Sequence, residues 1–508
     1  MLFRSLAVTL PQAGNLGGGG FLMVWDPRSR RAHALDFRET APRRVRPELY
    51  LRPDGSVDPR RTTDGLLSVA VPGSVAGLLE AQQRFGRLSR AQVLAPAVAL
   101  ARDGIVVDSW LAGSLAQAAP RLRRDPAAAA VYLHPEGRPY RVGERLRQPD
   151  LAATLARLAR QGPDGFYRGP FATALAALMA RGGGLIDQAD LAAYRPRWRD
   201  PVGTSFAGLT VLSMPPPSSG GVTLVLLLHL LEPLDLAGMG LNSAAAIHWM
   251  VEAMNLAYRD RNALLGDPDG GPLPVAALTD RAYADLLRAA IDPQRHTPAD
   301  RLGPPPLAPG GGGENTTHLS VADRDGGLAA LTTTLNLAYG SGIAVPGTGV
   351  LLNNEIDDFT IVAGAPNAFG LRQGDRNGIA PGRRPLSSMT PTLVLDAEGR
   401  GWIATGSPGG SRIITTVLQV LLQRLVWGGN LATAVAAPRI HCQLWPDLLA
   451  LEEGFSPDTL ALLEGMGHSL QRAAAMGAAN SVEVLLPLGS GSLGVVDPRR
   501  GNGPAQPQ

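Results

Sequence analysis

The chain has 508 residues, 45% of them apolar, which is enough to bury a large core. All 47 basic residues are arginine, so Schiff-base chemistry and the lysine of a phosphate-binding loop are excluded. The net charge is only +3, and the arginines are scattered among acidic residues, so we expect no nucleic-acid partner. The single Cys442 permits no internal disulfide and no thiolate metal site, and we expect neither a metal nor a cofactor.

The first part of the chain predicts a short helix end followed by two strands. Residues 1–10 contain one arginine and a short apolar run, but they continue directly into Gln12 and a glycine run. We therefore predict the end of a helix and a turn here, not a cleavable signal peptide. Strands are predicted at 20–25 and 32–37, and the glycines at 17–20 should let neighbouring backbone segments approach closely.

The middle of the chain is predicted to be rich in helices. Apolar residues recur with helical spacing over 75–104, 151–162, 170–181 and 244–265. The most apolar stretch, 222–231, has ten residues and includes His229, which is too short for a membrane span and is typical of a buried core helix. We expect no membrane-spanning segment.

The second half begins with a Gly/Pro-rich linker at 303–315 and continues as short strands. Strands are predicted at 319–321, 328–335, 349–352, 391–395 and 402–404, and a long buried helix at 413–427. The linker is too short to separate independent folds, so we expect one globule made of two interleaved pieces. Two central sheets with helices on both outer faces would fit this pattern, among other layer orders.

The junction between the linker and the first of these strands has the features of a hidden N-terminus. Here Thr316 follows Asn315 and is the first residue of the segment TTHLS at 316–320. A hydroxyl in this place can attack the preceding carbonyl, and cleavage would free an α-amine beside that same hydroxyl. An α-amine with a pKa of about 8 can then accept the hydroxyl proton near neutral pH. Taken alone the signal is weak, because Thr-Thr pairs open many strands.

Longer sequence blocks make the interpretation specific. They are LGGGGF at 16–21, DFRE at 36–39, VPGSVAG at 71–77, MPPPSSGG at 214–221, TTTLN at 332–336, LLNNEIDDF at 351–359, RPLSSM at 384–389 and TGSPGGSR at 405–412. In this order they resemble the γ-glutamyltranspeptidases, over nearly the whole chain. That family belongs to the N-terminal nucleophile hydrolases. The resemblance implies an α/β fold with a four-layer αββα sandwich, and a precursor that cuts itself into a large subunit (1–315) and a small subunit (316–508), which form one intertwined heterodimer.

The resemblance also implies catalytic roles. Thr316 matches the nucleophile, and cleavage is expected between Asn315 and Thr316. Thr334 matches the threonine that hydrogen-bonds the nucleophile. Gly409 and Gly410 match the residues whose backbone N–H groups form the oxyanion hole, where a side chain would obstruct the tetrahedral intermediate.

Substrate-binding residues follow from the charges of a γ-glutamyl group, which carries an α-carboxylate and an α-ammonium. A guanidinium can fork onto the carboxylate with help from hydroxyl groups, and acidic or amide oxygens can accept from the ammonium. At the family positions, the carboxylate side comprises Arg38, Ser387, Ser388 and the neighbouring Met389, and the ammonium side Asn336, Glu355 and Asp358.

One position departs from the family. Segment 359–377 corresponds to a lid loop in which relatives often place an aromatic residue with a hydroxyl, whereas Phe369 stands here. A phenyl ring can still cover the site, but a hydrogen bond from the lid is lost. The balance between hydrolysis and transpeptidation therefore stays open.

The resemblance implies an autoprocessing γ-glutamyltransferase and glutathione hydrolase that forms a γ-glutamyl ester on Thr316 and passes the group to water, an amino acid or a dipeptide. Two alternatives are a cephalosporin (glutaryl) acylase, against which Asp358 argues, and a non-catalytic binding protein, which would not need to keep Thr316, Thr334 and the two glycines.

The family also implies a periplasmic or extracellular location. This chain shows no signal peptide and starts inside what relatives build as a helix-to-strand unit, so we expect a late start, or a cytoplasmic protein if the start is genuine.

Overall fold

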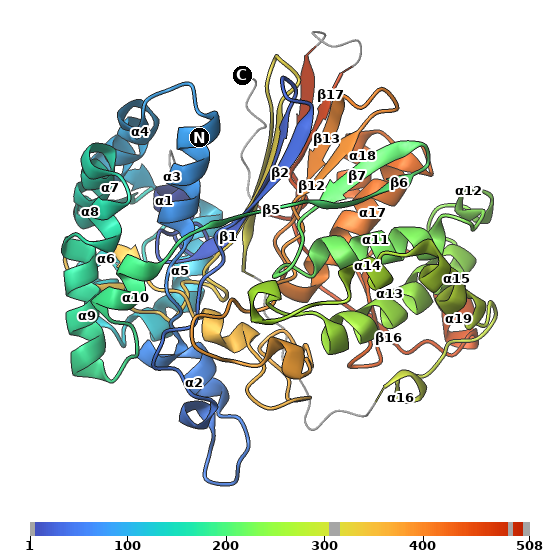
Figure 1. Cartoon of the computed structure of the whole chain (residues 1–508), viewed down its shortest axis with the longest axis horizontal. Helices are drawn as coiled ribbons and strands as arrows, with labels where there is room; N and C mark the ends of the chain where they lie inside the picture. The colour runs from blue at the N-terminus through green and yellow to red at the C-terminus, as the bar shows by residue number, and fades with distance from the viewer. Residues whose placement is uncertain (1–5, 304–314, 486–490, 501–508) are drawn as a thin grey trace.

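The computed structural model describes residues 6–303, 315–485 and 491–500 (Figure 1). Its centre holds two antiparallel sheets. The first has the strand order β5-β2-β1-β9-β8, with bounds β5 Arg197–Arg199, β2 Arg31–Asp36, β1 Gly19–Asp26, β9 Leu328–Thr334 and β8 Thr317–Ala322. Because β1 pairs with β9, the segments before and after residue 316 share one sheet.

The second sheet is also built from both halves of the chain. Its order is β18-β17-β13-β12-β7-β6, with bounds β18 Ser492–Val495, β17 Ser481–Val484, β13 Gly401–Thr405, β12 Thr392–Leu395, β7 Leu209–Ser213 and β6 Val202–Phe206. This sheet therefore also combines strands from before and after residue 316. Smaller sheets are β3 (Ile105–Val106) with β4 (Arg145–Leu146), β10 (Ala344–Val345) with β11 (Val350–Leu351), and β14 (Ile440–His441), β15 (Leu449–Leu451) and β16 (Leu470–Arg472).

Along each strand, successive side chains point to opposite faces of the sheet, and this alternation produces the layers. Phe21 of β1 packs between the sheets in one core with Leu393 of β12, whereas its neighbour Leu22 packs on the other face with the residues under α3 (Ser74–Phe85). In β12 the next residue, Val394, faces the helices α11 (Gly220–Leu231), α13 (Ala244–Leu264) and α17 (Ile413–Leu425). This period of two gives each sheet one face toward the other sheet and one toward helices. The four-layer αββα sandwich is confirmed.

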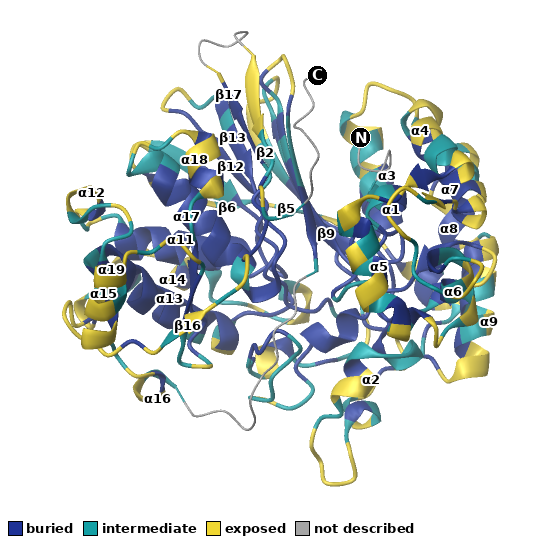
Figure 2. Cartoon of the chain, turned by 180° about the vertical axis from the view of Figure 1, so that it is seen from behind, coloured by how far each residue is buried: buried dark blue, intermediate teal, exposed yellow. Residues whose placement is uncertain are grey.

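A second lobe consists of helices around their own apolar core (Figures 1 and 2). Its helices are α1 Leu6–Thr9, α2 Pro59–Thr63, α4 Arg90–Asp103, α5 Ser109–Leu122, α6 Pro126–Tyr132, α7 Pro149–Gln161, α8 Asp164–Tyr167, α9 Pro170–Gly182 and α10 Gln188–Ala193. The remaining helices are α12 Leu236–Met239, α14 Val275–Leu278, α15 Arg281–Ala289, α16 Ala299–Leu302, α18 Leu431–Ala436 and α19 Pro457–Gly465. Figure 2 shows buried residues on the inner side of both lobes and exposed ones on the outside.

Most predicted elements agree with the structure, with one correction. The helical pattern at 75–104 is two helices, because Gly86 is the C-cap of α3 and Ser89 is the N-cap of α4, where its side chain forms a capping box with Gln92. Every residue of α11 is buried, as predicted for the apolar run at 222–231. Within the described ranges, no helix combines the length and the apolarity that a membrane span requires.

The glycine run confirms the predicted close approach of backbone segments. A Cβ atom on Gly17 would lie 1.9 Å from the carbonyl oxygen of Leu351, and one on Gly18 would lie 1.9 Å from that of Thr334. These glycines let the turn before β1 pack directly against the end of β9. Most of the predicted linker, 304–314, lies outside the described residues.

Candidate active site

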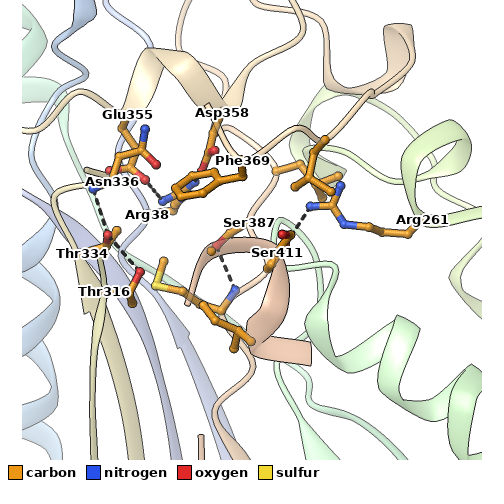
Figure 3. A pocket seen from close by; sticks show the side chains of 16 residues that line it. Arg38, Arg261, Thr316, Thr334, Asn336, Glu355, Asp358, Phe369, Ser387 and Ser411 are labelled. Atoms are coloured by element: carbon orange, nitrogen blue, oxygen red, sulfur yellow. Dashed lines mark hydrogen bonds and ion pairs between the residues drawn. The ribbon is translucent and has the colours of Figure 1, made fainter. Parts of the chain in front are cut away.

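A pocket opens where β9 ends, and its walls come from α13 and from the segments before β12 and after β13 (Figure 3). It is lined by Arg38, Arg261, Thr316, Thr334, Asn336, Glu355, Asp358, Phe369, Leu371, Leu386, Ser387, Ser388, Met389, Gly410, Ser411 and Ile413. Every candidate site residue predicted from the sequence is in this lining except Asn315 and Gly409, each the chain neighbour of a lining residue. The sequence did not single out Arg261, Leu371, Leu386, Ser411 or Ile413.

Thr316 and Thr334 meet at the start of β8. Their Oγ1 atoms are 3.3 Å apart, and Thr334 Oγ1 donates to the carbonyl oxygen of Asn315 at 3.0 Å. Thr334 Oγ1 also accepts from the backbone N–H of Asn336 at 2.8 Å. Because the single proton of Thr334 is used on Asn315, the Thr316 hydroxyl must donate its own proton to Thr334. The hydroxyl of Thr316 and the carbonyl that precedes it are thus held by one residue.

The two glycines form the turn before the 3₁₀ helix η7 (Gly410–Arg412), which leads into α17. Their φ angles are 135° and 57°, in the region that favours glycine. A Cβ atom on Gly410 would lie 2.4 Å from Cδ1 of Phe369. Neither backbone N–H donates to another residue of the described chain, and their role as an oxyanion hole stays a prediction.

Phe369 covers the pocket beside Gly410, and its side chain is almost fully buried. Its backbone N–H donates to Asn367 Oδ1 at 3.0 Å, and its carbonyl accepts from Gln443 Nε2 at 3.2 Å. These bonds fix the backbone of Phe369. Its role as a lid during turnover stays a prediction.

Arg38 lies at the centre of a buried charge cluster. Its guanidinium forms ion pairs with Glu355 and Asp358, lies 3.6 Å from Glu39, and donates from Nε to the Pro385 carbonyl at 3.1 Å. Burial opposes the charge of Arg38, but the three carboxylates together outweigh it and raise its pKa. The predicted cation and the predicted anions of the pocket are therefore paired with one another.

The carboxyl groups of this cluster titrate unusually. Burial raises the pKa of Glu39 to about 7, and it raises the pKa of Glu355 and of Asp358 as well. Oε2 of Glu355 and both oxygens of Glu39 have no donor among the described residues. A proton held by one of these two carboxyls can bond to the other, which lowers the cost of burying both.

Asn336 shapes the floor of the pocket. It has a φ of 73°, a left-handed conformation that asparagine tolerates better than most residues. Its Nδ2 donates to the Asn354 carbonyl at 3.0 Å. This bend at the end of β9 turns the chain so that Thr334 and Asn336 both face the pocket (Figure 3).

Away from the pocket, His248, Glu252 and His468 could offer metal ligands, since their candidate atoms lie within 4.8 Å of one another. These atoms are already hydrogen-bonded: His248 Nδ1 to His468 Nε2 at 2.8 Å, and Glu252 Oε1 to His296 Nδ1 at 2.6 Å. The predicted absence of a metal stays a prediction. His441, the neighbour of Cys442, is buried and bonds Thr415 at 2.9 Å.

Comparisons with known proteins agree with this geometry. A sequence profile described as Gamma-glutamyltranspeptidase matches residues 4–506. The chain belongs to the γ-glutamyltranspeptidase family. It is 44% identical to the glutathione hydrolase proenzyme of Escherichia coli K12 over 94% of this chain and 82% of that protein, and 42% identical to that of Pseudomonas sp. strain A14 over 98% and 88%. The acylase ACY 1 proenzyme of Pseudomonas sp. strain SE83 is 37% identical over 92% of this chain and 81% of its own length.

Solved structures show the same fold. A cephalosporin acylase from Bacillus halodurans superposes with a TM-score of 0.84 at 26% identity, over 98% of this chain and 88% of the other. The γ-glutamyltranspeptidase of Helicobacter pylori superposes with a TM-score of 0.58 at 36% identity, over 60% of this chain and 86% of that chain. The acylase shares more of the fold as one chain, whereas the transpeptidase shares more of the sequence.

Proposed function

We propose that this family member is an autoprocessing γ-glutamyltransferase and glutathione hydrolase whose nucleophile is Thr316. The relatives of highest identity quoted above are glutathione hydrolase proenzymes. The observation that carries the assignment to Thr316 is the placement of Thr334 Oγ1, 3.0 Å from the Asn315 carbonyl oxygen and 3.3 Å from Thr316 Oγ1. A site that only binds substrate would not require one hydroxyl, that of Thr334, to contact both the Thr316 hydroxyl and the carbonyl oxygen of Asn315.

Autocleavage follows from these contacts. Thr316 Oγ1 attacks the Asn315 carbonyl carbon as its proton passes to Thr334 Oγ1, which gives its own proton to the carbonyl oxygen. The hydrogen bond from Thr334 to the carbonyl oxygen polarises that carbonyl. The C–N bond breaks, the nitrogen takes up a proton, and an Asn315 ester on Thr316 remains. Water then hydrolyses the ester, leaving a carboxylate at the end of the large subunit (1–315) and a free α-amine and hydroxyl on Thr316 of the small subunit (316–508).

Turnover repeats this chemistry on the substrate. The free α-amine accepts the hydroxyl proton while Thr316 Oγ1 attacks the γ-carbonyl, and the backbone N–H groups of Gly409 and Gly410 stabilise the negative oxygen. The leaving amine takes the proton, and a γ-glutamyl ester remains. Water or the amine of an acceptor then attacks the ester and restores Thr316.

Recognition uses the charge cluster. A donor carries the same pair of charges that Arg38 and its acids bring to the pocket, so its α-carboxylate can replace an acid beside Arg38 while its ammonium pairs with the acid released, Asp358 or Glu355. Asn336 offers a further oxygen to the ammonium. The exchange preserves the number of ion pairs, so a buried charge is not left without a partner. Glutathione and other γ-glutamyl amides fit this scheme.

The acylase alternative differs in one testable respect. A glutaryl group has no ammonium and would leave Asp358 and Glu355 paired only with Arg38. We therefore propose γ-glutamyl over glutaryl donors. A periplasmic or extracellular site of action is also part of the proposal, and cell fractionation of the native host tests it.

The function is tested by release of the anilide from γ-glutamyl-p-nitroanilide, with and without a dipeptide acceptor, against glutaryl-p-nitroanilide. We expect turnover of the γ-glutamyl compound and faster release when acceptor is added. Preference for the glutaryl compound would favour the acylase, and no turnover of either by a cleaved protein would overturn the enzymatic assignment.

A further inference from the structure

Arg261 is a buried arginine in the pocket that sequence patterns did not identify. It lies on α13 with 1% of its surface exposed, and Figure 3 shows its guanidinium reaching the pocket wall beside Ser387 and Ser411. Burial lowers the pKa of Arg261 to about 10, so it still carries its charge at neutral pH. A buried cation usually has an anionic partner.

The other deeply buried arginines have carboxylate partners. Arg38 pairs with Glu355 and Asp358, Arg384 with Asp36 at 3.0 Å, and Arg439 with Asp497. Within the described ranges, Arg261 has no carboxylate at ion-pair distance. Asp358, the acid that acts on it at longer range, is already bound to Arg38. An uncompensated buried charge is costly, so a partner from outside the chain would be favoured.

The hydrogen bonds of Arg261 use neutral acceptors. Nε donates to Ser219 Oγ at 3.0 Å, Nη1 donates to Asn262 Oδ1 at 2.8 Å and to Gln373 Oε1 at 3.1 Å, and Nη2 donates to Ser388 Oγ at 3.0 Å. A guanidinium has five N–H groups, so one N–H of Nη2 is not used by these four bonds. This N–H belongs to the nitrogen that touches Ser388.

The two serines of the pocket are prepared as donors by the same bonds. Ser388 Oγ accepts from Arg261, and Ser387 Oγ accepts from the backbone N–H of Met389 at 3.1 Å. Each hydroxyl therefore has an occupied acceptor side and one proton to donate. No acceptor for either proton is found among the described residues. Two hydroxyl protons and one guanidinium proton thus remain for a ligand that only accepts, which describes a carboxylate.

We propose that Arg261 is a positioning residue of the α-carboxylate subsite, which it serves by fixing the Ser388 hydroxyl as a donor and by supplying positive charge that Arg38, neutralised by Glu355 and Asp358, cannot supply alone. The inference rests on the proposed function, because the carboxylate is that of the γ-glutamyl donor. Arg261 selects donors by this group and takes no part in bond breaking.

Two donor substrates that differ only in the α-carboxylate isolate the effect of Arg261. γ-Glutamyl-p-nitroanilide has the α-carboxylate, and 4-aminobutyryl-p-nitroanilide lacks it but keeps the amine and the scissile amide. We expect Arg261→Gln to raise KM for the γ-glutamyl compound by about 10- to 100-fold, the worth of a charge-assisted hydrogen bond. Its kcat should change little, and kcat/KM for the aminobutyryl compound should change by less than about threefold, since that donor never uses the subsite.

Further variants separate positioning from folding. Arg261→Lys should recover part of the lost affinity, because it keeps the charge. Adding Arg261→Gln to Ser388→Ala should cost much less than the product of the two single effects, since both act through one hydroxyl. Arg439→Gln also removes a buried arginine, but away from the pocket, so it should lower activity on both donors by the same factor.

Equal losses on the two donors for Arg261→Gln, or a fall in kcat with unchanged KM, would overturn the inference. If Arg261→Gln does not fold, the Arg261→Lys variant gives the same comparison. Calorimetric binding of L-glutamate and of 4-aminobutyrate to the unaltered protein is independent of turnover. Tighter binding of glutamate, lost in the Arg261 variants, supports the subsite even if the proposed reaction fails, and equal binding of the two ligands contradicts it.

Discussion

Two buried charge clusters join the segments before and after residue 316, and they are built differently. In the cluster around His296, Nδ1 bonds Glu252 at 2.6 Å and Nε2 bonds Asp447 at 2.9 Å. The second oxygens of these acids accept from the backbone N–H groups of Thr297 and Ala299. In the cluster around Arg38, by contrast, oxygens of Glu39 and Glu355 lack donors. Full pairing is typical of a structural clamp, and incomplete pairing beside a cavity is typical of a binding site.

The pKa shifts also differ between the two clusters. In the pocket, burial dominates and raises the pKa of Glu355 and Asp358. In the histidine cluster, burial opposes the charges, but the hydrogen bonds outweigh it, so the pKa of His296 rises to about 9 and that of Asp447 falls. Charges stabilised where they stand hold two segments together, whereas carboxylates whose charge is opposed by burial gain from the approach of a second cation such as an ammonium.

The largest effect should come from the nucleophile. Thr316→Ala should abolish both chain cleavage and anilide release, because no hydroxyl remains to form the ester. Thr316→Ser keeps the hydroxyl but loses the methyl group that restricts its rotamer, so some of each should survive. A denaturing gel and the anilide assay measure the two effects. Substantial turnover by the alanine variant would place the nucleophile elsewhere.

Next in size is the loss of an acid from the pocket cluster. Asp358→Asn removes a negative partner of the donor ammonium, so kcat/KM for γ-glutamyl anilide should fall by about 100-fold or more, consistent with the loss of a buried charge partner. Glutaryl anilide, which lacks the ammonium, should lose far less. Glu252→Gln in the histidine cluster is the matched control and should leave the ratio of the two activities unchanged. Equal losses on both donors for Asp358→Asn would show that Asp358 serves the scaffold.

The histidine cluster should affect stability in a pH-dependent way. His296 has a pKa of about 9 when folded and about 6.5 when unfolded, so its contribution is complete below pH 6.5 and is lost as the pH rises through 9. Thermal unfolding from pH 6 to 10 should show a falling Tm in the parent, and a smaller fall in His296→Gln, with an unchanged donor preference. His468 lies near His296 and hydrogen-bonds His248, so His468→Gln is measured alongside. The same dependence of Tm on pH in the parent and in His296→Gln would contradict a stabilising role for the His296 charge.

The smallest effect is expected at the cover of the pocket. Phe369→Tyr adds a hydroxyl to the ring, and one neutral hydrogen bond is worth about 0.5–1.5 kcal/mol, or roughly 2- to 10-fold. The ratio of transfer to hydrolysis should shift by no more than that, while cleavage stays complete. Product analysis with a dipeptide acceptor measures the ratio, and an unchanged ratio would mean that a lid hydroxyl does not control it.

The sequence located one of these clusters far better than the other. Arg38, Glu355 and Asp358 stand in long motifs, so resemblance identified them before their contacts were known. The partners of His296 could not be found this way, because Glu252 and Asp447 come from a helix and a distant loop, and no local pattern joins them.

Arg261 was missed for a related reason. It follows Arg259 and Asp260 near the end of α13, where alternating charges usually indicate a solvated helix face. Only packing shows that its side chain is buried and turned toward Ser388. The split between α3 and α4 was likewise hidden, because apolar spacing continues across the break at Gly86 and only the caps mark it.

The central claim is that Thr316 is a nucleophile made available by cutting its own peptide bond. Mass spectrometry of the smaller fragment, from protein purified without added protease, tests it most directly. The account predicts a fragment whose first residue is Thr316, and an intact chain for Thr316→Ala prepared in the same way. A different first residue, or an uncut chain that still turns over γ-glutamyl anilide, would contradict it.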